Sequence, residues 1–191
     1  QETLDMYGIG KPATDDYGRR CLMARRLVEK GVRFVSVVAG GGPGNMQWDA
    51  HEDIEENHLR MAGHTDQPCA ALIKDLKRRG LLDSTIVIWG GEFGRTVYSQ
   101  GDLTETNYGR DHHPRCFAMW LAGGGIKPGV SYGETDDYSY NIAENPMDVH
   151  DLHATMMHCL GVDHTKLTYK FQGRHYRLTD VHGRVVRDLL A

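Results

Sequence analysis

Three short apolar segments, each followed by glycines, constrain the fold of this chain more than any other feature. They span residues 32–39, 85–89 and 116–122. A continuous apolar run of this length that stops at glycines is typical of a strand buried on both faces. The pattern therefore predicts three buried strands, each leading into a glycine-rich loop.

Amphipathic helices are expected around these segments. Apolar residues recur at helical spacing over residues 15–30, over a stretch that starts at Asp66 and Pro68 and ends at Gly80, and over residues 148–160. Strands that alternate with helices are typical of a mainly parallel sheet with helices on both faces. We therefore expect an α/β fold of this kind, in which ligands bind beyond the carboxyl ends of the strands.

The composition is that of a globular protein and argues against two classes of partner. The 22 basic and 26 acidic residues give a formal charge of −4, and neither sign forms a long block. This balance disfavours a nucleic-acid surface or a basic membrane-binding face. No apolar run approaches the roughly 20 residues that a membrane-spanning helix needs. The 191 residues suffice for one domain or a large part of a bigger one.

Carboxylate, imidazole and guanidinium groups lie next to the ends of the expected strands. Asp49 and His51 follow the first strand, Glu92 and Arg95 follow the second, and a charged run precedes the third. Asp49 and His51 are two residues apart, so in an extended segment their side chains point the same way. The candidate metal ligands are Asp49, His51, Glu92, Asp111, His112 and His113, and the candidate anion-binding residues are Arg95 and Arg110.

This mixture of carboxylates and imidazoles suits one or two divalent ions. Zinc accepts such a set, and the carboxylates also favour the harder ions Ca²⁺, Mg²⁺ and Mn²⁺. Simpler roles exist for single residues: Asp49 as a helix N-cap, His112 and His113 as loop residues bonded to backbone, and Arg95 as a salt-bridge partner of a nearby carboxylate. The joint placement at strand ends favours metal binding, because gathering several charges is costly without a compensating ion or substrate.

Six short motifs in a fixed order make the sequence recognisable. They are WDAH at 48–51, WGGEFGRT at 89–96, GRDHHP at 109–114, LAGGGIKPG at 121–129, DLHATMMHCLGVDH at 151–164 and LTDVHG at 178–183. Together they resemble the domain of unknown function 1501 family, a sulfatase-like group placed with the alkaline phosphatase superfamily. The resemblance implies that residues 1–191 are the C-terminal part of one alkaline-phosphatase-like domain, with the nucleophile in an upstream segment, and it suggests an exported or periplasmic protein.

The resemblance also implies roles for individual residues. Asp49 and His51 stand where the superfamily places a first Asp and His on one metal, and His112 stands where it places a further His. Glu92 takes the position of the Asp in an Asp-His pair, while Phe93 replaces the paired His. A second metal ion would therefore need Asp111 or His113 as a substitute ligand.

The expected function is metal-dependent hydrolysis of sulfate or phosphate esters. One or two divalent ions would polarise the ester oxygen and activate the nucleophile, while Arg95 or Arg110 would hold the small anionic ester through paired donors. The alternative is a non-catalytic metal-binding or ligand-binding protein that retains the fold, which the loss of the paired His at Phe93 favours. A third reading is a structural domain without metal. The sequence leaves open the choice between sulfate and phosphate, the metal and the oligomeric state.

Overall fold

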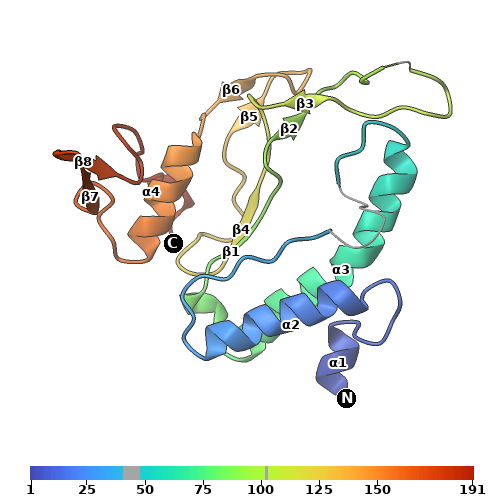
Figure 1. The fold of residues 1–191 in the computed structure, drawn as a ribbon, viewed down its shortest axis with the longest axis horizontal. Helices are drawn as coiled ribbons and strands as arrows, with labels where there is room; N and C mark the ends of the chain where they lie inside the picture. The colour runs from blue at the N-terminus through green and yellow to red at the C-terminus, as the bar shows by residue number, and fades with distance from the viewer. Residues whose placement is uncertain (41–47, 102) are drawn as a thin grey trace.

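A computed structural model describes residues 1–40, 48–101 and 103–191 of the chain (Figure 1). Its helices are α1 (Glu2–Met6), α2 (Asp15–Glu29), α3 (Ile54–Arg78) and α4 (Val149–Cys159), with two short 3-10 helices, η1 (Leu82–Ser84) and η2 (Arg187–Leu189). Its strands are β1 (Val87–Trp89), β2 (Gly94–Arg95), β3 (His112–His113), β4 (Trp120–Ala122), β5 (Glu134–Thr135), β6 (Ile142–Glu144), β7 (Thr168–Phe171) and β8 (Arg174–Arg177).

The described strands pair only as antiparallel couples, so the expected mainly parallel sheet with helices on both faces is wrong. The four two-stranded sheets are β1–β4, β2–β3, β5–β6 and β7–β8. Parallel neighbours need a long crossover connection, usually a helix. The described residues between β1 and β4 hold only the short strands β2 and β3, which fold back on each other. The chain therefore returns to β1 in the opposite direction.

The first expected strand, residues 32–39, is also not a strand in the structure. It contains neither helix nor strand, and no described strand pairs with it. It runs along α2 instead, where Val37 packs against the core and Arg20 donates a hydrogen bond to the Val38 carbonyl at 3.0 Å. A run of β-branched residues favours an extended backbone. It becomes a strand only where another part of the fold supplies a partner strand.

The helix pair α2–α3 forms the main core in the lower part of Figure 1. Tyr7, Cys21, Leu22 and Ala71 are almost fully buried there. Helix α2 matches its predicted position, and Gly31, at φ +87°, follows its end. Helix α3 starts at Ile54, a full 12 residues before Asp66, because the polar stretch ahead of Asp66 forms the exposed first turns of the same helix.

A buried carboxylate joins the two long helices. Asp75 is fully buried and lies 2.9 Å from Arg25 Nε of α2 and 2.9 Å from Arg79 Nε. The Tyr7 hydroxyl donates to the same carboxylate at 3.1 Å. Burial alone would raise the pKa of Asp75, but these hydrogen bonds and positive charges outweigh it and lower the pKa. The ionised carboxylate thus holds α1, α2 and α3 together.

The C-terminal region, orange to red in Figure 1, is built around α4 as the sequence predicts. Asp148 and Asp151 form a capping box at its first turn. Asp151 also accepts a hydrogen bond from the Arg184 backbone at 2.7 Å, and Thr155 accepts one from the Val186 backbone at 3.0 Å. These two residues therefore dock the chain end onto the helix. Among the described helices, none has the length and apolar character needed to cross a membrane.

Candidate metal centre

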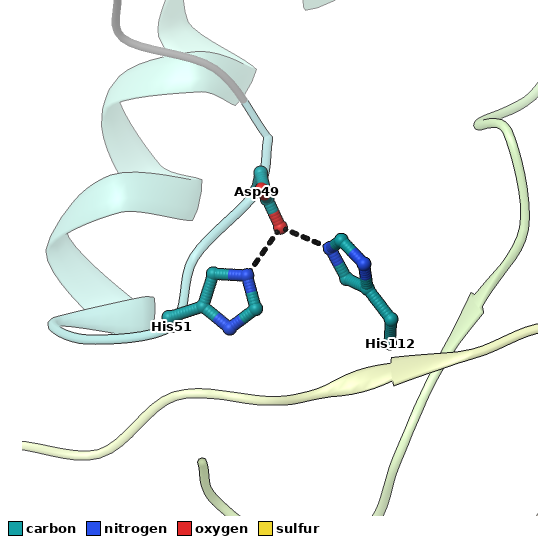
Figure 2. A group of neighbouring side chains, drawn as sticks. All are labelled: Asp49, His51 and His112. Atoms are coloured by element: carbon teal, nitrogen blue, oxygen red, sulfur yellow. Dashed lines mark hydrogen bonds and ion pairs between the residues drawn. The ribbon is translucent and has the colours of Figure 1, made fainter. Parts of the chain in front are cut away.

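Three side chains from two separate segments converge on one point. Asp49 and His51 come from the loop that leads into α3, and His112 comes from β3 (Figure 2). The Asp49 Oδ1 atom lies 3.0 Å from His51 Nε2 and 2.9 Å from His112 Nε2. All three ligand atoms lie within 4.8 Å of one another. This group was predicted from the sequence as part of a larger set.

The β2–β3 pair decides which predicted residues reach the group. Arg95 is the cross-strand partner of His112, so their side chains share a face. His113 is the next residue along the strand and points to the other face, where its Nε2 lies 2.5 Å from the Tyr140 carbonyl and its ring stacks on Tyr140. The structure therefore separates His113 from the ligands that converge.

Close backbone contact between two loops holds the ligands in register. The Arg110 backbone donates a hydrogen bond to the Ala50 carbonyl at 3.0 Å. At Gly109 the chains are so close that an added Cβ atom would lie 2.1 Å from the His51 carbonyl. Gly109 was not among the predicted site residues, although a glycine beside a charged run is a signal for close backbone approach.

Arg95 bridges Asp49 and a second carboxylate. Its Nη1 atom lies 2.9 Å from Asp49 Oδ1, an ion-pair distance without the alignment of a hydrogen bond, and its Nη2 donates to Glu92 at 3.0 Å. The structure therefore places Glu92 beside Arg95 and outside the three converging ligands. The salt-bridge role weighed for Arg95 is present here, and anion binding stays a prediction.

The remaining candidates lie at the edge of the site. The Asp111 carbonyl accepts the backbone N–H of Thr96, and the Asp111 backbone N–H donates to the Thr96 hydroxyl, each at 2.9 Å. The Asp111 carboxylate accepts the backbone N–H of His112 at 2.7 Å. The Arg110 guanidinium lies 5.5 Å from the centre of the Tyr108 ring and donates to the Gly109 carbonyl. Asp111 thus positions β3, while the Arg110 guanidinium packs against Tyr108 of its own loop.

The surroundings keep Asp49 ionised. Partial burial would raise the pKa of Asp49, but the hydrogen bond with His112 and the positive charge of Arg95 outweigh it, so the pKa is lowered. An ionised carboxylate and neutral imidazoles are the protonation states that a metal ion requires. In this respect the Asp49 carboxylate fits a divalent ion.

The spacing and chemistry of the group also fit. Two ligand atoms on one tetrahedral zinc ion lie about 3.3 Å apart, since each is about 2.0–2.1 Å from the metal. The two nitrogen-to-oxygen separations at Asp49, 2.9 and 3.0 Å, are close to that value. Asp49 and His112 are exposed and His51 is half-buried, so the group is open to solvent. The three residues form a possible metal site, and their geometry does not select one metal ion.

A match to a known family accompanies this geometry. The family model described as "Protein of unknown function (DUF1501)" matches residues 1–190. The chain belongs to this family. A search of curated proteins and a search of solved structures each gave no match. Membership in the domain of unknown function 1501 family confirms the resemblance drawn from the six motifs, and the placement of that family among the sulfatases is a separate proposal.

Proposed function

We propose that this member of the domain of unknown function 1501 family is a metal-dependent hydrolase of sulfate or phosphate esters, related to sulfatases and alkaline phosphatases. The observation that carries the proposal is the convergence of Asp49, His51 and His112 within 4.8 Å, with Arg95 at the same carboxylate oxygen. Three protein ligands with an open position are typical of catalytic zinc sites, whereas structural sites use four.

Asp49, His51 and His112 would hold the ion. A bound divalent ion supplies a Lewis acid that polarises an ester oxygen. Asp49 contributes the negative charge of the ligand set, and the two imidazoles contribute neutral donors. The backbone contact at Gly109 and the β2–β3 pair fix the ligands before a substrate arrives.

Arg95 would bind the anionic group of the ester. Its side chain is one-quarter exposed. The Nη2 atom donates to Glu92, whereas the Nη1 atom lies at Asp49 Oδ1. A planar guanidinium presents paired donors that match a tetrahedral sulfate or phosphate. The positive charge of Arg95 lies next to Asp49, so an ester bound by Arg95 would lie beside the metal ion.

One observation favours a second candidate, a metal-binding protein without hydrolytic activity. Phe93 meets the His112 ring edge-on, with centroids 5.2 Å apart, at the position where the superfamily resemblance implies a paired His. An apolar ring there cannot bind a second ion. A protein of this kind would bind one ion and an anionic ligand but would not turn the ligand over.

Turnover in the protein expressed from its complete gene distinguishes the two candidates. We expect hydrolysis of an aryl sulfate or an aryl phosphate that a chelator abolishes and that zinc or manganese restores. His112→Ala should abolish the activity, and Arg95→Lys should reduce it by about a hundredfold, the typical effect of removing one preorganised donor. Arg110→Lys is the matched control and should retain activity. Zinc binding without turnover of either ester would support the non-catalytic candidate.

A further inference from the structure

All three tryptophans of the chain lie in one cluster beside the candidate metal centre. Trp89 of β1 and Trp120 of β4 are cross-strand partners, with ring centroids 6.4 Å apart and ring planes within 5° of parallel. Trp48 meets Trp89 edge-on at 6.1 Å. We call these three residues the tryptophan cluster.

The tryptophan cluster is partly exposed to solvent. Trp89 and Trp120 keep 36% and 39% of their surface exposed, and Trp48 is half-buried. Ile88 and Leu121 alternate with them and lie on the opposite face of the two-stranded sheet, so the large rings occupy the more open face. Half-exposed indoles are typical of contact surfaces, because they offer a large apolar face and one polar N–H group.

The position of the cluster relates it to the candidate metal centre. Trp48 directly precedes the ligand Asp49 in the chain. Trp89 lies three residues before Glu92, which accepts a hydrogen bond from Arg95. Trp48 therefore borders the candidate metal centre along the chain, and Trp89 ends the strand that leads toward Arg95.

We propose that the tryptophan cluster binds a sugar ring, so that the ester at this site is a sulfated or phosphorylated carbohydrate. The inference rests on the proposed function. A pyranose presents an apolar face of C–H groups that stacks on an indole, while its hydroxyl groups stay in water or bond to polar neighbours. The exposed His58, whose ring lies 5.5 Å from that of Trp48, is such a neighbour.

A sugar unit with one anionic group fits the surroundings better than a nucleic-acid strand does, because one anionic group needs only the single guanidinium of Arg95. Proteins that stack bases on aromatic side chains combine the stack with a positively charged groove for the backbone. This chain carries a formal charge of −4, and its basic residues form no long block. The rings also lie on an open two-stranded sheet, which suits the side of a carbohydrate chain.

Intrinsic fluorescence tests the inference directly, because all three tryptophans of residues 1–191 belong to the cluster. We expect dextran sulfate to change the emission of the wild-type protein in a saturable manner. Poly(vinyl sulfate), which carries the same anion without sugar rings, should cause no comparable change at equal sulfate concentration. An equal response to both polymers would show simple polyanion binding and overturn the inference, as would tighter binding of adenosine monophosphate than of dextran sulfate.

Two variants distinguish a loss of sugar binding from a loss of folding. Trp120→Ala should weaken dextran sulfate binding by about tenfold, the effect of losing one aromatic contact. Phe117→Ala is the matched control, since Phe117 is 43% exposed and lies outside the cluster, and its affinity should not change. If circular dichroism shows that Trp120→Ala is unfolded, Trp48→Ala replaces it. Wild-type affinity in the folded variant would overturn the inference.

Metal binding and sugar binding can be tested separately. His112→Ala should lose zinc binding but keep the fluorescence response to dextran sulfate. A protein that binds zinc and shows no response to dextran sulfate would contradict the sugar inference alone. A protein that responds to dextran sulfate but binds no divalent ion would contradict the proposed function and leave a carbohydrate-binding surface.

Discussion

His112 Nε2 lies 2.9 Å from Asp49 Oδ1, although 63 residues separate the two in sequence. His112 sits on a two-residue strand, and Asp49 sits in a loop. The contact therefore depends on two arrangements made elsewhere, the β2–β3 pair and the approach of Gly109 to His51. Backbone contacts that join two loops thus build the site. Predictions about the site concern both its ligands and these backbone contacts, which form its framework.

The first prediction concerns the framework at Gly109. Gly109→Ala would place a Cβ atom 2.1 Å from the His51 carbonyl, so the two loops must move apart. We expect a lower melting temperature and a loss of zinc affinity in isothermal titration calorimetry. Gly91→Ala is the control, because its added Cβ atom would lie 3.7 Å from the Phe93 carbonyl oxygen, an ordinary van der Waals contact. Equal zinc affinities for the two variants would show that the close approach is not needed.

The second prediction concerns the charge that Arg95 places at Asp49 Oδ1. A metal ion at that oxygen meets the positive charge of Arg95, which lies 2.9 Å away. Arg95→Gln should therefore raise zinc affinity by a few-fold, roughly the size of an exposed ion pair, while it lowers sulfate affinity. Arg110→Gln should change neither, since its guanidinium packs on Tyr108. Weaker zinc binding by Arg95→Gln would indicate that Arg95 mainly holds Asp49 in place.

The third prediction concerns the buried carboxylate of the helix core. Asp75→Asn leaves Arg25 and Arg79 facing a neutral partner in a buried position. Breaking a buried ion pair costs about 3–5 kcal/mol of unfolding free energy, which urea denaturation can measure. Asp83→Asn removes a charge from an exposed position and should cost less than about 0.5 kcal/mol. Similar costs for the two variants would show that the Asp75 network contributes little.

The fourth prediction is the pH dependence of that network. The folded-state pKa of Asp75 lies below its ordinary value of 3.8. Its contribution is therefore fully present above pH 3.8 and is lost as the pH falls through the lower folded-state value. The stability difference between wild type and Asp75→Asn should be constant near neutral pH and shrink below about pH 4. A difference that grows toward acid pH would contradict the sign of the shift.

Helix positions and part of the site could be predicted from the sequence because they depend on local patterns. The spacing of apolar residues predicted the positions of α2 and α4. The two-residue spacing of Asp49 and His51 predicted that their side chains point the same way, and they lie in contact. The alternation along β3 also explains why only one of His112 and His113 joins them, although the sequence analysis counted both. These are consequences of backbone geometry within a few residues.

Strand pairing could not be predicted in the same way. Residues 85–89 and 116–122 are apolar and end at glycines, which suits parallel and antiparallel neighbours alike. The direction depends on the connection between them, and here the β2–β3 pair takes the place of a crossover helix. The antiparallel register also brings Trp89 and Trp120 together, a contact that no local pattern indicates.

Zinc titration of three proteins by calorimetry at neutral pH tests the central claim most directly. Wild type should bind one ion, and His113→Ala should bind it with the same affinity, because that side chain contacts Tyr140. His112→Ala should lose at least about tenfold in affinity, because one of the three ligands is gone. A wild-type protein that binds no zinc, or equal losses in the two histidine variants, would contradict the assignment of Asp49, His51 and His112 as a metal centre.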